Sequence, residues 1–128
     1  MSLILSKSGL NPSFVVGGII PDVHTNAEYS EHGKEFIAEL DESDGTIVKY
    51  SPDIVVVNNL EADHLDFYKN GLDSVVDTFK TFLSNLHTDA KIIINNDNLG
   101  NIGLLKFYPN AITFGLKNAD YVAKNIVY

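Results

Sequence analysis

The 128-residue sequence contains no cysteine, and its nine basic residues are all lysine, so it also lacks arginine. Without cysteine the chain can form neither a disulfide nor a thiolate metal site, which fits the cytoplasmic location that we expect. Without arginine it has no bidentate phosphate clamp. If this chain handles phosphate, part of the binding apparatus must therefore come from outside it.

Long hydrophobic runs are also missing, since no apolar stretch approaches the roughly 20 residues of a membrane-spanning helix. Met1–Leu3 does not have the features of a signal peptide. Seventeen acidic residues against nine lysines give a net charge of −8. Nucleic-acid binding requires a basic surface that neutralises phosphates, so neither a nucleic acid nor a membrane is expected as a partner.

The 45% hydrophobic content suits one globular domain. Short apolar runs predict the strands of a mostly parallel sheet, and they are continuous rather than alternating, as in strands covered on both faces. The five runs are Phe14–Val16, Phe36–Ala38, Ile54–Val57, Ile92–Ile94 and Ala111–Phe114. Tyr121–Tyr128 is predicted as a weaker edge strand.

Apolar residues at helical spacing between Leu72 and Leu86 predict a crossover helix, with Asn70 as its N-cap. A shorter helix is expected between Asp97 and Phe107, before the turn at Pro109-Asn110. The predicted fold class is α/β, a mostly parallel sheet flanked by helices.

Polar segments follow the predicted strands, where open parallel sheets bind ligands. Four carboxylates lie within six residues, which suits a hard divalent cation but also suits a solvated acidic loop. They are Glu39, Asp41, Glu42 and Asp44. His64 follows another strand and could be a metal ligand, a general base or a hydrogen-bonded loop residue. His24, His32 and His87 are expected at the surface.

Gly17-Gly18 could bring the backbone close to a ligand or form a turn. The sequence contains neither a G-x-x-x-x-G-K-[ST] loop nor a G-x-G-x-x-G fingerprint, so nucleotide binding has no motif of its own. A hydrolase triad of Ser43, His64 and an aspartate would lack a nucleophile elbow.

Taken together, several segments resemble the central ATP-binding domain of the Mur ligases, in their alanine-adding branch. The resemblance rests on GLNPSFVVGG at 9–18, AELDESDG at 38–45, SPDI at 51–54 and NLEADHLDFY at 59–68, in that order. Asn95-Asn96-Asp97 and Ala119-Asp120-Tyr121 are similar as well. The DESDG and EADHLD segments are the specific ones.

The resemblance implies a P-loop-type ATPase domain and an ATP-dependent ligase of peptidoglycan synthesis, which joins L-alanine to UDP-N-acetylmuramate through an acyl phosphate. It implies that Glu39 and His64 are the catalytic residues and bind the Mg²⁺ that accompanies ATP. We also expect Gly17, Gly18, Asn26 and Asn59 to contact ATP. Phe79 stands where several relatives carry a carbamylated lysine, so that second metal ligand should be absent.

The phosphate loop of the family is missing from this sequence, so 1–128 is predicted to be a partial central domain. The N-terminal nucleotide-sugar domain and the C-terminal domain are missing too, and Met1–Leu3 is interpreted as an expression remnant. We expect the isolated chain to be inactive, and it could form a homodimer. The alternatives are a ligase that recycles murein peptides onto the same nucleotide sugar, and a non-catalytic acidic binding module.

Overall fold

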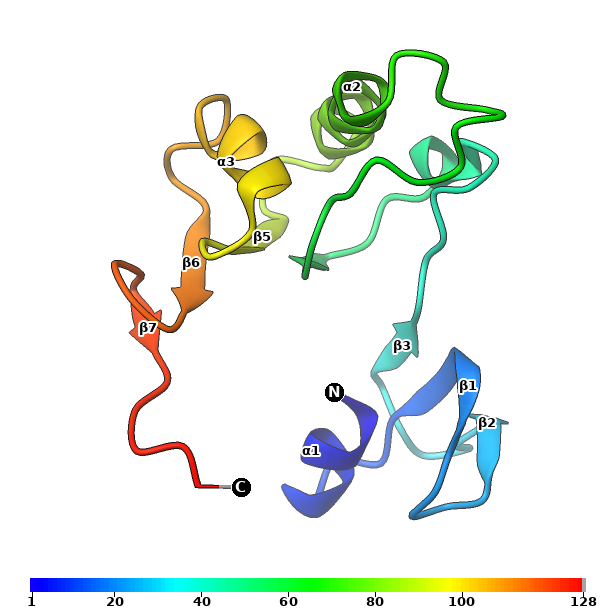
Figure 1. The fold of residues 1–128 in the computed structure, drawn as a ribbon. Coiled ribbons are helices and arrows are strands. Elements are labelled where there is room, and N and C mark those ends of the chain that lie inside the picture. The colour runs from blue at the N-terminus through cyan, green and yellow to red at the C-terminus, as the bar shows by residue number, and fades with distance from the viewer. Residues whose placement is uncertain (128) are drawn as a thin grey trace. The chain divides into compact units, whose positions relative to one another are not determined.

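A computed structural model describes residues 1–127, and the chain divides into two compact units, Met1–Leu40 and Asp41–Tyr128. Figure 1 shows the order of the elements along the chain. Each unit has a sheet of its own, so the predicted strands do not form one continuous sheet. The two units are described separately below.

The first unit contains helix α1 (Ser2–Lys7) and a three-stranded sheet. Its strands are β1 (Ser13–Ile20), β2 (Thr25–Glu28) and β3 (Phe36–Ala38), in the order β2-β1-β3. β1 pairs with β3 in parallel and with β2 in antiparallel orientation. The sequence TNAE of β2 has no apolar run, and for this reason the strand was not predicted.

β1 bulges where it passes β2. Val15 is paired with Ala27 and Ile20 with Thr25, so the four residues of β1 from Val16 to Ile19 face only Asn26 on β2. Extra residues in one strand bend it and leave backbone groups outside the ladder. Gly17 and Gly18 therefore lie in an irregular part of a strand and do not form the turn considered from sequence.

The second unit contains a four-stranded, entirely parallel sheet with the order β4-β5-β6-β7. Its strands are β4 (Ile54–Val57), β5 (Lys91–Asn95), β6 (Ile112–Gly115) and β7 (Tyr121–Val122). A 3-10 helix, η1 (Thr46–Lys49), precedes β4, while α2 (Leu72–Ser84) and α3 (Leu99–Leu105) provide the crossovers. The predicted α/β fold class is confirmed.

Apolar side chains of α2 and of alternate strand positions form the core of the second unit. Val55 and Val57 of β4 are buried and pair with Ile92 and Ile94 of β5. Ile54 and Val56 point the other way and are 60% and 39% exposed. The prediction that both faces are covered is therefore wrong for β4, whose side chains alternate between exposed and buried along the strand.

Three boundaries differ from the predictions. Gly71, at φ 59°, occupies the N-cap of α2 in place of Asn70, because glycine adopts this left-handed backbone with little strain. α3 begins after Asn98, whose side chain caps it. The last strand ends at Val122, and Tyr128, the end of the predicted edge strand, lies outside the described residues. Among residues 1–127, no helix is long and apolar enough to cross a membrane.

Candidate functional site

Glu39 directly follows β3, and a backbone hydrogen bond from the neighbouring strand holds its carboxylate. The Gly17 N–H donates to Glu39 Oε2 at 2.7 Å. A Cβ atom at position 17 would lie 3.3 Å from the same oxygen, so a side chain there would crowd the carboxylate. Glu39 itself is exposed. The bulge of β1 thus supplies the amide that orients a solvent-accessible carboxylate.

The structure brings the other predicted ligand-binding residues of the first unit to the same bulge. Asn26 is the residue of β2 that faces Val16–Ile19, the stretch that contains Gly17 and Gly18. All three are exposed. Four of the predicted site residues, Glu39 included, therefore lie in one part of the first unit.

The acidic loop of the second unit is ordered by hydrogen bonds to its own backbone. Ser43 N–H donates to Asp41 Oδ1 at 2.6 Å, and Thr46 donates to Asp44 Oδ1 through its N–H and its hydroxyl. The hydroxyl and the N–H of Ser43 lower the pKa of Asp41, and Thr46 does the same for Asp44. Both carboxyls are therefore ionised at neutral pH.

The segment that carries His64 packs against this loop. The buried Tyr68 hydroxyl donates to the Glu42 carbonyl oxygen, and the Phe67 ring lies edge-on to the Tyr68 ring. Gly45, at φ 70°, leaves room for Phe67, since a Cβ there would lie 2.9 Å from the ring. The structure thus joins the two segments, DESDG and EADHLD, on which the resemblance chiefly rests.

His64 is half-buried and has a left-handed backbone with φ 50°. Its N–H donates to Asp63 Oδ1 at 2.7 Å, and its carbonyl oxygen accepts the N–H groups of Phe67 and Tyr68. The charge of His64 adds a smaller lowering to the pKa of Asp41. His64 therefore lies close enough to the acidic loop to interact electrostatically with Asp41.

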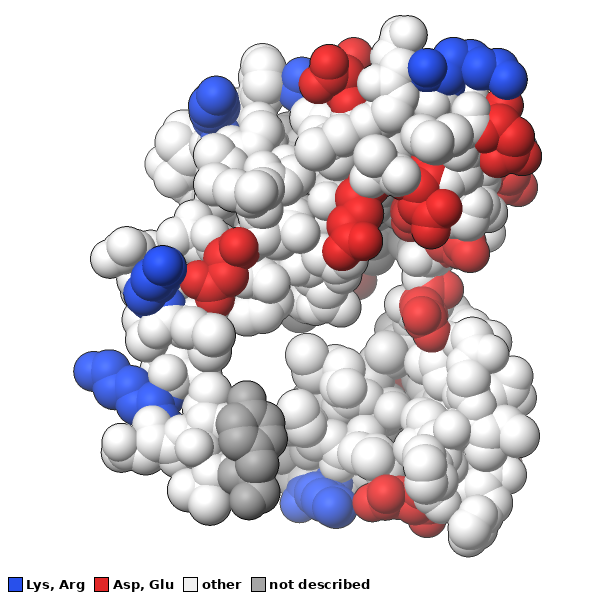
Figure 2. Space-filling model, in the orientation of Figure 1, with Lys and Arg blue, Asp and Glu red and all other residues white. Residues whose placement is uncertain are grey.

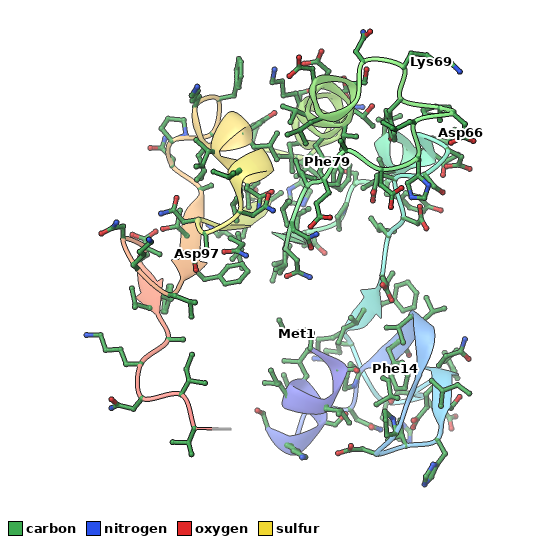
Figure 3. All side chains as sticks on the ribbon, viewed as in Figure 1. Met1, Phe14, Asp66, Lys69, Phe79 and Asp97 are labelled. Atoms are coloured by element: carbon green, nitrogen blue, oxygen red, sulfur yellow. The ribbon has the colours of Figure 1, made fainter. Side chains whose placement is uncertain are left out.

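Acidic side chains gather over the part of the second unit near η1 and the loop before α2 (Figure 2). Asp66 and Lys69 lie on that loop, and Phe79 lies on α2 (Figure 3). Phe79 is only 7% exposed and packs edge-on against Phe82. The position where relatives were expected to carry a modified lysine is therefore a core position in this chain.

Asn59 is exposed in the loop after β4, where its Nδ2 donates to Glu61 Oε1 at 3.1 Å. The residues on either side of Asn59, Asn58 and Leu60, are hydrogen-bonded to side chains at the start of α3. Asn101 Nδ2 donates to the carbonyl oxygen of Asn58, and Asn98 Oδ1 accepts the Leu60 N–H. Neither Asn98 nor Asn101 was predicted as a site residue from the sequence. The signal in the sequence that could have indicated them is Asn98 immediately before an apolar helical segment, which is the pattern of an N-cap, with Asn101 three residues later.

Among residues 1–127, no three His, Cys, Asp or Glu side chains are grouped so as to hold a metal ion. Glu39 lies in the first unit and His64 in the second. A carboxylate combined with water and phosphate oxygens fits Mg²⁺, while an imidazole is a less usual ligand for it.

The family profile described as the Mur ligase middle domain matches residues 23–128. A UDP-N-acetylmuramate–L-alanine ligase from Geotalea uraniireducens is 40% identical over 130 aligned residues, which cover 98% of this chain and 28% of the relative. The corresponding ligase from Mycolicibacterium vanbaalenii is 42% identical over 96 residues, covering 75% of this chain and 20% of the relative.

Solved structures agree on the fold. The UDP-N-acetylmuramate-alanine ligase of Thermotoga maritima superposes with a TM-score of 0.73 at 26% identity, over 94% of this chain and 26% of that one. The UDP-N-acetylmuramate:L-alanyl-gamma-D-glutamyl-meso-diaminopimelate ligase of Neisseria meningitides gives a TM-score of 0.72 at 22% identity, over 89% of this chain and 40% of that one. The chain thus spans about 28% of the length of the first curated relatives it matches.

Proposed function

The chain belongs to the Mur ligase middle-domain family, and from this premise we propose that it is the central part of an ATP-dependent ligase that joins L-alanine to UDP-N-acetylmuramate. The 40% identity to such a ligase across 98% of the chain carries the proposal. In the proposed reaction, the muramate carboxylate takes the γ-phosphoryl group of ATP and ADP leaves. The amine of L-alanine then attacks the acyl phosphate, and phosphate leaves as the amide forms. We propose this as a cytoplasmic step of peptidoglycan synthesis.

Glu39 and His64 are the proposed ligands of the Mg²⁺ that accompanies ATP. When bound, the ion would neutralise phosphate charge during phosphoryl transfer. The Gly17 N–H donates to Glu39 Oε2. The other carboxylate oxygen, Oε1, has no hydrogen bond among the described residues and is available to a cation. The Gly17 amide thus orients the proposed oxygen ligand, and His64 would supply the nitrogen ligand.

Gly17, Gly18, Asn26 and Asn59 are the proposed contacts to ATP. All four are exposed, and the first three lie at the bulge beside Glu39. At this bulge the absence of a side chain on Gly17 and Gly18 would let ATP approach the backbone closely. Because the 128 residues contain no phosphate-loop motif and no arginine, we propose that this chain alone does not catalyse the reaction.

The decisive experiment compares Glu39→Ala and His64→Ala in the full natural polypeptide that carries these residues. Glu31→Ala and His32→Ala are matched controls, because both residues are exposed loop positions outside the proposed site. We expect the first pair to lower kcat for ADP formation, in the presence of L-alanine and UDP-N-acetylmuramate, by about 100-fold or more. Normal turnover in both site variants would refute the assignment.

The same assay separates the two ligase branches. We expect turnover with L-alanine and none with the tripeptide L-alanyl-γ-D-glutamyl-meso-diaminopimelate. Preference for the tripeptide would support the recycling ligase, whose solved relative shows only a shared fold at 22% identity. Absence of ATP-dependent turnover with either would favour the acidic binding module.

We further propose that the isolated chain self-associates through the exposed apolar face of β4. Ile54 and Val56 lie there, and such faces in parallel sheets are normally covered. Light scattering should give a mass above that of the monomer, and Ile54→Lys should reduce it. A monomeric mass at high concentration would contradict the proposal.

A further inference from the structure

We propose that Asn98 and Asn101 are positioning residues for Asn59 and thereby set the affinity of the ligase for ATP. The inference rests on the proposed function and adds two residues that neither the sequence motifs nor the family resemblance pointed to. Both lie at the start of α3, 39 and 42 positions after Asn59 in the chain. Neither is proposed to touch the nucleotide.

Asn101 acts as a donor between two neighbouring strand ends. Its side chain is fully buried, and its Nδ2 donates to the carbonyl oxygens of Asn95 at 3.0 Å and Asn58 at 3.2 Å, with a longer contact of 3.5 Å to Val57. Asn95 closes β5, and Val57 closes β4. One amide group therefore ties the loop after β4 to the end of the adjacent strand.

Asn98 acts as an acceptor on the other side of Asn59. Its Oδ1 accepts the N–H of Leu60 at 3.1 Å and the N–H of Asn101 at 3.0 Å. The second bond caps α3, so the same oxygen fixes the helix and the loop together. Gly100 lets them approach, because a Cβ there would lie 2.3 Å from the Leu60 carbonyl oxygen.

Asn59 is thus held through its backbone neighbours while its own side chain remains exposed. Asn58 is fixed by Asn101 and Leu60 by Asn98, which leaves little freedom for the backbone of the residue between them. The side chain of Asn59 makes one hydrogen bond, to Glu61. A rigid backbone under an exposed amide is the arrangement that lowers the entropy lost when a ligand binds.

Packing alone does not account for Asn101. Its Oδ1 is buried and has no hydrogen-bond partner among residues 1–127. An unsatisfied buried acceptor destabilises a fold, so an asparagine at this position has a cost that an apolar side chain would not have. Local violations of this kind are expected where a residue serves a site. The hydrogen bonds from Asn101 Nδ2 to the carbonyl oxygens at the strand ends are what offsets this cost.

The test measures KM for ATP and kcat in the full natural polypeptide for wild type, Asn59→Ala, Asn101→Asp and the double variant. Asn101→Asp keeps the shape but replaces the donor by an oxygen facing carbonyl oxygens. We expect Asn59→Ala and Asn101→Asp each to raise KM for ATP by about tenfold with little change in kcat. If Asn101 acts through Asn59, the double variant is no worse than Asn59→Ala. Asn110→Asp, an exposed substitution of the same kind, should keep the wild-type KM.

A merely structural role for Asn101 would give a different result. The effects of Asn59→Ala and Asn101→Asp on KM would then multiply, or Asn101→Asp would lower Tm and leave KM unchanged, and either outcome overturns the proposal. If Asn101→Asp does not fold, Asn98→Ala provides the test, with Asn98→Asp as the rescue because it keeps the acceptor oxygen. An unchanged KM in folded Asn98→Ala would overturn it too. A wild-type polypeptide without ATP turnover refutes the proposed function. If the wild type is active and the folded Asn101 or Asn98 variant has the wild-type KM, only the positioning role is refuted.

Discussion

The two units of the molecule are stabilised in different ways. Of the thirteen buried hydrophobic side chains found among residues 1–127, the second unit contains twelve and the first contains one, Phe14. The first unit is organised mainly by backbone pairing around β1 and by single contacts such as the one between Gly17 and Glu39. The second combines a helix-covered parallel sheet with side-chain bonds at its strand ends.

This difference indicates that the two units respond differently to substitution. A unit with a hydrophobic core loses stability when core atoms are removed, because burial of apolar surface is the main favourable term in folding. A unit with few buried apolar side chains loses less stability on substitution. Substitutions there act mainly on the exposed groups that could bind a ligand. The following substitutions test this contrast, beginning with the largest effect.

Phe82→Ala should have the largest effect. Phe82 is 1% exposed and packs edge-on against Phe79 within the second unit. Removing the ring should lower the free energy of unfolding by about 3–5 kcal/mol, measured by urea denaturation. Phe36→Ala, at a residue of the first unit that is 69% exposed, is the control and should change it by less than about 0.5 kcal/mol. Equal losses in both variants would remove the contrast between the units.

Gly100→Ala and Gly103→Ala test the packing of α3 at the strand ends. The new Cβ at position 100 would lie 2.3 Å from the Leu60 carbonyl oxygen, so we expect a loss of about 1–3 kcal/mol. At position 103 it would meet Val76 at 3.5 Å, an ordinary contact, and the better helix former should add about 0.5–1 kcal/mol. Thermal unfolding of both variants measures the difference, and a stabilising Gly100→Ala would contradict the described approach of α3 to Leu60.

Tyr68→Phe removes the hydroxyl that joins the two motif segments of the second unit. We expect a loss of about 1 kcal/mol at neutral pH. Burial raises the pKa of Tyr68 above 10.0, so the unfolded chain ionises first and wild-type stability falls as pH rises from about 10 through the folded pKa. The variant should lose less stability over this range. Equal pH profiles in wild type and variant, from denaturation at pH 7 and above pH 10, would show that Tyr68 does not contribute.

Gly17→Ala should have the smallest effect on stability and a visible one on function. The added Cβ crowds Glu39 Oε2 at 3.3 Å, and the exposed carboxylate can move away at little cost. We expect a stability change below about 0.5 kcal/mol, with a several-fold rise in the Mg²⁺ concentration needed for half-maximal turnover of the full polypeptide. Gly103→Ala, where the added Cβ would meet Val76 at an ordinary 3.5 Å, is the control because Gly103 lies outside the proposed site. Identical metal dependence in the two variants would refute the role given to the Gly17 amide.

The helices and strands that were predicted correctly from the sequence are those with a regular pattern of apolar residues. Ile54–Val57 and the helix from Leu72 were predicted close to their observed bounds because buried side chains repeat at the period of the element. β2 was missed since its exposed residues leave no such pattern. The division into two sheets could not be predicted either, because apolar runs do not specify which strand edges pair.

The candidate site residues were predicted individually from the sequence, but the contacts between them were not. The segments around Glu39 and His64 were found through their resemblance to a family, whereas composition left a solvated acidic loop equally open. Three hydrogen bonds join residues far apart in the sequence, and in each of them one partner is a backbone group: Gly17 N–H to Glu39, Tyr68 to the Glu42 carbonyl oxygen, and Asn101 to the Asn58 carbonyl oxygen. Such bonds leave no local signature, because any residue provides the backbone partner.

The left-handed backbone of His64 implies a trade-off between stability and activity. A non-glycine residue in this conformation costs roughly 1 kcal/mol, which His64→Gly would relieve. Selection for a more stable fold alone would therefore favour glycine at this position, at the loss of the imidazole. A search for thermostable forms of this domain should exclude position 64, because there the change that helps folding removes the proposed metal ligand.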